Sequence, residues 1–295
     1  MADEQGIPTG AVSDAVGSGD GPALRLEEVA REGPGTRQPA LTVADARTGR
    51  STGIPPGRRM LLRVGVRLGC AGGRIGAGDL RAALVGDVLQ RVAEIEGLQV
   101  VRVLAVAEGA AADFGRAAAA LGVHPPVAVV ASGDPDGPLG GPPDVQVLAA
   151  DAERAGAAGV WLGVGPARPD RGGELAAGLG SGAVDASALR LALLARPYGE
   201  PVVAGPRELA EAAGTLRDWR RQVADWAWGP SKPVPDEIRR EAAAAFTGDL
   251  DTPAVLALLH RVGAASGLAD GARFETFAAL DRVLGLELTR DVGRR

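Results

Sequence analysis

The segment between residues 60 and 106 constrains the fold of this chain more than any other, because it alternates strand, loop, helix and strand. The run Met60-Leu-Leu-Arg-Val-Gly-Val66 is typical of a buried strand, and Val100–Val106 predicts a second one. Between them lie a loop with six glycines, Gly65–Gly78, and a helix whose apolar side chains share one face: Leu80, Leu84, Val88, Val92 and Ile95. Two strands joined by one helix imply a right-handed parallel crossover. We therefore expect a Rossmann-like parallel sheet.

The predicted sheet domain spans residues 39–185. Residues 39–50 form an alternating strand followed by a turn, and three further apolar runs extend the sheet: Val127–Ala131, Val145–Ala149 and Gly159–Val164. Between the first two of these runs, Gly133–Pro143 consists almost entirely of Gly, Pro and Asp, which predicts an exposed loop. Residues 1–38 contain few large apolar groups and are predicted to form a flexible tail.

From residue 186 to residue 295 the apolar period becomes helical. One apolar stripe repeats every three or four positions, at Leu209, Ala213, Leu216, Trp219, Val223 and Trp226. Two further helices are predicted to start at Pro235 and Asp251, where proline stands in the first turn or an acid can cap free amides. The predicted architecture is α/β, with a reduced Rossmann-like parallel sheet followed by a C-terminal helical bundle.

Composition limits the classes of partner and compartment. The net charge of −5 argues against a large phosphate-neutralising surface, so nucleic-acid binding is unlikely. No signal peptide or membrane-spanning run is visible, which predicts a cytoplasmic protein. The use of arginine almost to the exclusion of lysine, with Lys232 as the one lysine, indicates a GC-rich, actinobacterial-type genome. A single cysteine, Cys70, excludes an internal disulfide and a cysteine-clustered zinc site.

Four segments, in the same order, resemble the class I family that contains cysteinyl-tRNA synthetases and the mycothiol cysteine ligase. Gly78–Leu89 is similar to the helix after the HIGH motif of that family, and Leu121-Gly-Val-His-Pro-Pro126 matches its Leu-Gly-Val-x-Pro-Pro step. Val184–Leu194 contains the Ser-Ala-Leu-Arg-Leu-Ala-Leu-Leu helix, and Gly248–Leu256 contains the Asp-Leu-Asp-Thr-Pro helix of the C-terminal bundle. The four short segments are spread over roughly residues 40–290 and together make a fairly specific signal.

The resemblance implies a nucleotide-binding loop that has lost its catalytic groups. The HIGH positions fall on Gly76–Asp79, so both histidines that stabilise the reacting phosphate are absent and an acid stands there instead. A shift of two residues would place Arg74, Ile75 and Gly76 at the motif, again without histidine. The degenerate HIGH-like loop is therefore assigned to the following positions: Arg74, Gly76, Gly78 and Asp79.

A second, degenerate KMSKS-like loop follows from the same resemblance at Gly173–Ser181. Its matching positions are Gly173, Glu174, Gly178 and Gly180, and both lysines of the family motif are missing. Removing such preorganised charge typically costs about 3–4 kcal/mol per group. The family's zinc ligands are also absent, because Arg67 stands at the first cysteine position and Cys70 lies three residues later. We therefore expect no catalytic residue, no zinc, and ATP as the one cofactor that the loop could still hold.

Other features allow a structural or a functional interpretation, and the structural one is preferred for each. Cys70 is expected to be buried and inert, and His124 and His260 to be surface or packing residues. The glycines of the first loop serve either the backbone geometry or a nucleotide phosphate at the helix N-terminus. The tryptophans of the stripe are expected to pack in the core, although arginines beside them would also suit a partner protein or RNA.

Two functions remain open at this point. The first is a noncatalytic, synthetase-like pseudoenzyme that binds an unknown protein partner, for which we expect an exposed apolar patch and a shallow pocket beside Gly76–Asp79. The alternative is a divergent ATP-dependent ligase whose site is rebuilt around Arg67, Arg74, Asp79 and Arg81, for which these side chains should converge on an open pocket. A tRNA binder without catalysis is disfavoured by the acidic balance.

Overall fold

A computed structural model describes residues 41–54, 60–131, 135–154, 156, 158–168 and 174–294. The predicted tail, residues 1–38, and Gly173 lie outside the described residues. No helix within the described ranges combines the length and the apolar character needed to cross a bilayer.

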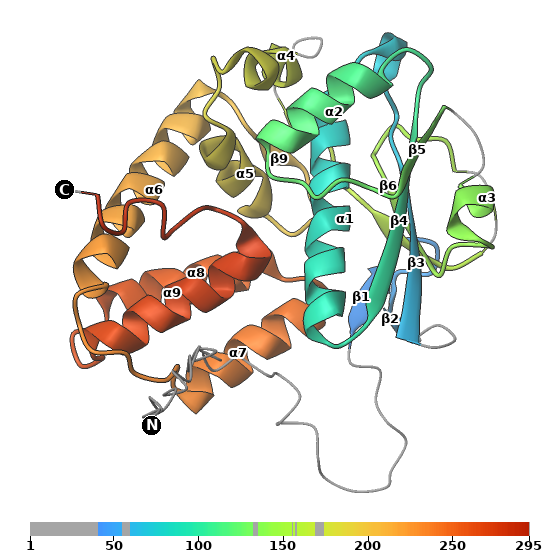
Figure 1. Cartoon of the computed structure of the whole chain (residues 1–295). Coiled ribbons are helices and arrows are strands. Elements are labelled where there is room, and N and C mark those ends of the chain that lie inside the picture. Colours follow the sequence, from blue (N-terminus) through green and yellow to red (C-terminus); the bar gives the residue numbers. More distant parts are fainter. Residues whose placement is uncertain are drawn as a thin grey trace, which may run out of the picture.

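The centre of the molecule is a five-stranded sheet in which every pair of neighbours is parallel (Figure 1). Its strand order is β5-β4-β3-β6-β7, with bounds Ala128–Ala131, Gln99–Val106, Leu61–Arg67, Val145–Leu148 and Val160–Gly163. In the register of the central strand, Gly65 stands beside Val103 on one side and Gln146 on the other. The predicted parallel, Rossmann-like sheet is confirmed.

Helices cover the two faces of this sheet unequally. On one face lie α1 (Ala77–Ile95) and α2 (Ala111–Ala120), and α1 runs between the sheet and the C-terminal helices (Figure 1). The predicted apolar stripe of α1 is buried from Leu80 to Val92. Gly86 permits the close approach of α1, because a Cβ there would lie 2.9 Å from the Val66 side chain. The predicted loop at residues 133–143 contains a short helix instead, α3 (Asp136–Leu139), which packs on the opposite face against β3 and β4.

Two small sheets flank the central one. The predicted N-terminal strand and turn are present as β1 (Thr42–Asp45) and β2 (Arg50–Gly53), an antiparallel pair. The chain just after β1 joins edge strand β7 through a 2.7 Å hydrogen bond from the Ala46 amide to the Trp161 carbonyl. The second small sheet pairs β8 (Ala167–Arg168) with β9 (Val202–Val203) in parallel.

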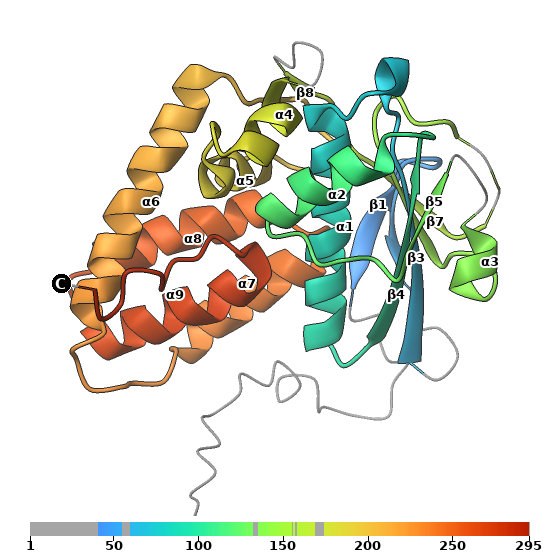
Figure 2. The same cartoon turned by 45° about the horizontal axis from the view of Figure 1, so that its top comes forward.

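The rest of the chain is helical (Figure 2). Two short helices lie earlier in the chain: the 3-10 helix η3 (Ala71–Gly73) and α4 (Glu174–Ser181). The C-terminal helices are α5 (Ala186–Leu194), α6 (Pro206–Trp226), α7 (Asp236–Thr247), α8 (Thr252–Ala264) and α9 (Asp270–Leu284). The rings of Trp219 and Trp226 both contact Phe277 edge-on, so these two tryptophans are core residues as predicted. Because one continuous apolar core joins the sheet and the helices, the domain boundary at residue 186 stays a prediction.

A buried carboxylate in the middle of α1 ties these layers together. Asp87 is fully buried. Its carboxylate accepts hydrogen bonds from Arg91 Nε at 2.8 Å, from an Nη of Arg190 at 2.9 Å and from the His124 amide at 2.9 Å, and His124 Nδ1 also lies 2.9 Å from it. Arg102 from β4 lies 3.8 Å away. Burial alone would raise the pKa of Asp87, but Arg190 and Arg91 hold that pKa below its ordinary value. Asp87 is therefore charged in the folded protein.

Arg190 extends the network from α5 to three other segments. Its guanidinium donates to the carbonyl of Leu284 at 2.5 Å and to the carbonyls of Leu121 and Gly122 at 2.9 and 3.1 Å. Gly285, which ends α9 in the left-handed conformation, leaves the space that this guanidinium needs, since a Cβ there would lie 2.8 Å from it. Helices α1, α5 and α9 and the chain before β5 therefore meet at one pair of charges.

Replacing this buried carboxylate should cost much of the stability of the protein. Asp87→Ala leaves Arg102 and Arg190 buried without their counter-charge, so we expect the free energy of unfolding to fall by about 3–5 kcal/mol. Urea unfolding followed by circular dichroism measures the change. Asp218→Ala, which removes an exposed aspartate from an ion pair with Arg221, is the control and should change it by less than about 0.5 kcal/mol. Equal effects of the two substitutions would contradict the role of Asp87.

Candidate functional site

The candidate site lies where the strand order of the sheet reverses. The chain leaves β3 in one direction toward β4 and β5, whereas β6 and β7 continue the sheet on the other side of β3. In open parallel sheets, ligands bind outside the carboxyl ends of the strands at such a reversal. The loop that follows β3, Leu68–Gly76, occupies this position and leads into the N-terminus of α1.

Asp79 turns inward and binds the backbone of that loop. Its carboxylate accepts hydrogen bonds from the amides of Gly69 at 2.7 Å, Cys70 at 3.2 Å and Gly76 at 2.9 Å, and the residue is only 3% exposed. Asp79 stands at the third position of α1 and accepts from the amide of the N-cap Gly76, which is one half of a capping box because Gly76 has no side chain to complete it. Burial raises the pKa of Asp79, the three amides oppose this rise, and the nearby charge of Asp151 adds to it. The positive end of α1 thus already holds an internal carboxyl group.

Arg74 is the predicted HIGH-like residue that faces an open pocket. The side chain is exposed and lines a cavity of about 400 Å³ together with Gly180 of α4 and residues of α2. From α2 come Asp113 and Arg116, which form an exposed ion pair with each other. The structure therefore brings one residue of the HIGH-like set beside one residue of the KMSKS-like set, and Gly76, Gly78 and Asp79 do not line this cavity.

The KMSKS-like segment is a helix, which corrects the prediction of a loop. Glu174–Ser181 forms α4, which packs against α2. The helix forms because Leu175, Ala176 and Leu179 fall on one apolar face and pack against the core. Gly178 packs closely, since a Cβ there would lie 2.6 Å from Val184, whereas a Cβ on Gly180 would meet open space.

Arg81 and Arg67 do not join Arg74 at the pocket. Arg81 is 1% exposed and donates to carbonyl oxygens of the chain around β8 and β9, at Gly165, Arg196, Pro197 and Glu200. Burial lowers the pKa of Arg81 to about 10. Arg67 Nε donates to Gln146 Oε1 at 3.2 Å on the neighbouring strand. Among Arg67, Arg74, Asp79 and Arg81, Arg74 alone lines the cavity.

The remaining polar candidates take structural positions. Cys70 is buried as predicted, and burial raises the pKa of its thiol. His260 is exposed and its ring lies 4.8 Å from that of Trp219. His124 is half-exposed, and its ring Nδ1 lies 2.9 Å from a carboxylate oxygen of Asp87. Within the ranges that the structure describes, no three His, Cys, Asp or Glu side chains gather in a way that could hold a metal ion.

The four segments that carry the family resemblance all make scaffold contacts. Three of them meet at Asp87, because that residue lies in the first segment, His124 in the second and Arg190 in the third. In the fourth, Asp249 accepts hydrogen bonds from the Tyr198 hydroxyl at 2.5 Å and the Ala44 amide at 2.7 Å. No sequence pattern indicates this network, and the one signal for Arg116 at the cavity is a charged pair within an alanine-rich helix.

Comparisons with known proteins support the resemblance over part of the chain. No protein-family model matches the chain. Two curated proteins are similar to it, both named L-cysteine:1D-myo-inositol 2-amino-2-deoxy-alpha-D-glucopyranoside ligase, from Streptomyces griseus and Streptomyces avermitilis. Each is 36% identical over 109 residues, which is 36% of this chain and 26% of the relative. The match therefore spans about a quarter of the length of these relatives.

Removal of the Asp79 carboxylate should destabilise the loop and the start of α1. In Asp79→Ala three backbone amides lose their acceptor, so we expect the free energy of unfolding to fall by about 1–3 kcal/mol. Asp113→Ala is a matched control, because Asp113 occupies the same third position of α2 but is exposed, and its effect should stay below about 1 kcal/mol. Thermal unfolding of both variants measures the difference. A larger loss in the control would contradict the structural role of Asp79.

Proposed function

We propose that this chain is a noncatalytic, synthetase-like binding or regulatory protein, related to class I ligases but without adenylate formation. The observation that carries the proposal is the position of Asp79 at the N-terminus of α1. In the family that the chain resembles, this helix end meets the reacting phosphates through two histidines. Here the carboxylate of Asp79 lies at this helix end and accepts hydrogen bonds from the amides of Gly69, Cys70 and Gly76.

The electrostatics of this position disfavour a bound phosphate. A helix N-terminus attracts one anion because its free amides and dipole point outward. The loop amides here already bind an internal carboxylate, and Asp151 adds a second acidic group close by. Like charges this close to one another repel. A nucleotide phosphate would have to overcome that repulsion without histidine or lysine at the site.

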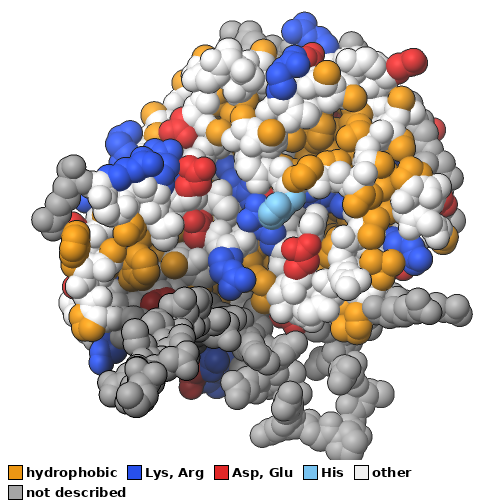
Figure 3. Space-filling view, in the orientation of Figure 1, with side chains coloured by type: hydrophobic (Ala, Val, Ile, Leu, Met, Phe, Trp, Pro, Cys, Tyr) orange, Lys and Arg blue, Asp and Glu red, His pale blue; other side chains and the backbone are white. Residues whose placement is uncertain are grey.

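Binding of a protein partner is supported by the apolar side of the molecule that carries α2 and β5 (Figure 3). Strand β5 is an edge of the sheet. Val129 on this strand is 43% exposed, and Val127 just before it is 62% exposed. Edge strands with exposed apolar side chains are favoured contact sites for other chains. We place this binding function in the cytoplasm of an actinobacterial-type cell.

The alternative is a divergent ATP-dependent ligase, and one observation favours it. The cavity of about 400 Å³ joins Arg74, in the HIGH-like loop, to Gly180, in the KMSKS-like segment, and Arg116 adds a second cation. The named activity of the two Streptomyces relatives is also that of a ligase. A working site would need Arg74 and Arg116 to hold phosphates, although Arg116 already pairs with Asp113.

Calorimetric titration with ATP and magnesium distinguishes the two functions. For the noncatalytic protein we expect no saturable heat up to about 1 mM ATP, a limit that corresponds to a binding free energy weaker than about −4 kcal/mol. Arg74→Ala should behave in the same way, because no phosphate contact is lost. Circular dichroism of each sample confirms that the protein is folded. Micromolar binding that Arg74→Ala weakens about tenfold would contradict the proposal and favour the ligase.

A further inference from the structure

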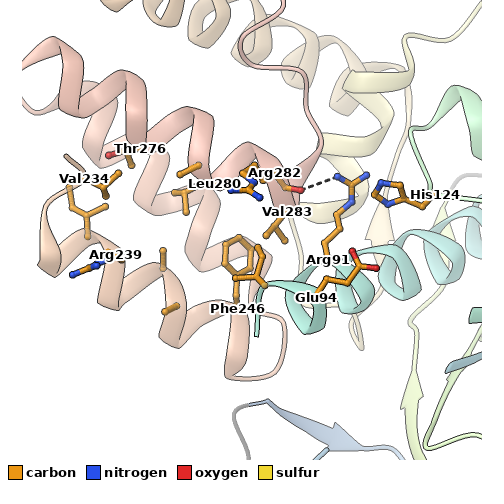
Figure 4. A pocket seen from close by; sticks show the side chains of 15 residues that line it. Arg91, Glu94, His124, Val234, Arg239, Phe246, Thr276, Leu280, Arg282 and Val283 are labelled. Atoms are coloured by element: carbon orange, nitrogen blue, oxygen red, sulfur yellow. Dashed lines mark hydrogen bonds between the residues drawn. The ribbon is translucent and has the colours of Figure 1, made fainter. Parts of the chain in front are cut away.

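A second cavity lies at the opposite end of α1 from Asp79. It measures about 480 Å³ and opens between the last turns of α1, the helix α7 and the helix α9 (Figure 4). The side chains of Ile95, Ile238, Phe246, Leu280 and Val283 give it an apolar lining. Small-molecule sites commonly have this size and combine such a lining with a few polar groups. No segment of the family resemblance assigns a ligand to this place.

Polar side chains gather at one end of the cavity. Figure 4 shows Arg91, Glu94 and His124 there, with Arg282 of α9 nearby. Arg91 is fully engaged by Asp87 and by the carbonyls of Gly122 and Arg282. Arg282 is exposed, and its guanidinium makes no hydrogen bond or ion pair with other residues that the structure describes. A cation in contact with the cavity is therefore available to a ligand.

The hydrogen-bonding groups at this end are mostly donors. The Nδ1 atom of His124 is held by Asp87, which leaves Nε2 of the half-exposed ring free to face solvent. Glu94 is the one acid in the lining, and its carboxylate already accepts a 2.8 Å hydrogen bond from Gln90. Three arginines line the cavity, but Arg91 pairs with Asp87 and Arg239 pairs with Asp236, so Arg282 is the cation that a ligand can reach. The cavity thus favours an anion over a cation.

The buried network behind this wall does not cancel the positive charge of Arg282. Arg91, Arg102 and Arg190 surround the buried Asp87. The neighbouring carboxylate of Asp281 accepts hydrogen bonds from the amides of Leu286 and Leu288. Counted once each with the lining, five arginines (Arg91, Arg102, Arg190, Arg239 and Arg282) stand against four acids (Asp87, Glu94, Asp236 and Asp281), so one positive charge is left over in a region where charges are weakly screened.

We propose that this cavity binds a small amphipathic anion. A carboxylate, sulfonate or phosphate head lies at the end that carries Arg282 and His124, and an apolar body lies over Phe246, Leu280 and Val283. The charge of the lining selects the head, and the apolar helix faces of α1, α7 and α9 bind the body. An uncharged molecule of the same shape gains the apolar contacts alone.

Two fluorescent probes test the inference on the full chain. Anilinonaphthalene sulfonate is an aromatic anion, and N-phenyl-naphthylamine has the same aromatic body without the sulfonate. We expect the anion to bind at one saturable site and Arg282→Gln to weaken it about tenfold, the loss typical of one charged contact. The uncharged probe should bind Arg282→Gln as it binds the unaltered protein. Arg282 is exposed, so its replacement leaves the core intact.

Two further variants locate the probe. Ala243→Phe, at a half-buried lining position of α7, fills the cavity and should abolish binding of both probes. Arg207→Gln removes an exposed arginine on α6, outside the cavity, and should change neither. Anion binding that is unchanged in Arg282→Gln, or that survives in Ala243→Phe, would overturn the proposal. Tight binding of an uncharged ligand that excludes the anion would overturn it as well.

Discussion

The contact between Asp87 and Arg190 is the interaction on which the rest of the structure depends. It joins α1 to α5 through two fully buried charges that lie 2.9 Å apart, and Arg190 at the same time binds carbonyls before β5 and after α9. A buried charge is tolerated only when it is paired and hydrogen-bonded, because desolvation of each ion costs several kcal/mol. The packing of the helices on the sheet is therefore fixed by one geometry that satisfies both charges.

This dependence explains why the resemblance to the family lies in segments that shape the fold. The segments that resemble class I synthetases contain Asp87, His124, Arg190 and Asp249. Each of these residues hydrogen-bonds to the backbone or to a buried charged side chain. None of them lines the cavity beside Arg74. The likeness therefore describes how the chain folds, whereas function depends on the sites that the fold presents.

The sequence predicted the parts of the structure that follow from local periodicity. The parallel sheet, the buried stripe of α1 and the core positions of Trp219 and Trp226 all follow from apolar repeats. Asp79 stands at the third position of α1, and its bonds to the loop amides of Gly69 and Cys70 depend on the folded loop, so no local pattern predicts them. The family motif predicts a loop at residues 173–181, whereas the apolar spacing of Leu175, Ala176 and Leu179 is that of a helix, and α4 forms there. The pairing of Asp87 with Arg190 joins residues 103 positions apart, which local pattern cannot reveal.

The proposed function requires that this synthetase-like chain forms no adenylate. Exchange of labelled pyrophosphate into ATP, with the purified 295-residue chain, magnesium and L-cysteine, is the direct test. Because Asp79 occupies the phosphate end of α1, the account predicts no exchange above the protein-free background. Cysteine-dependent exchange that is lost in Arg74→Ala would contradict the account and identify the cavity beside α4 as an active site.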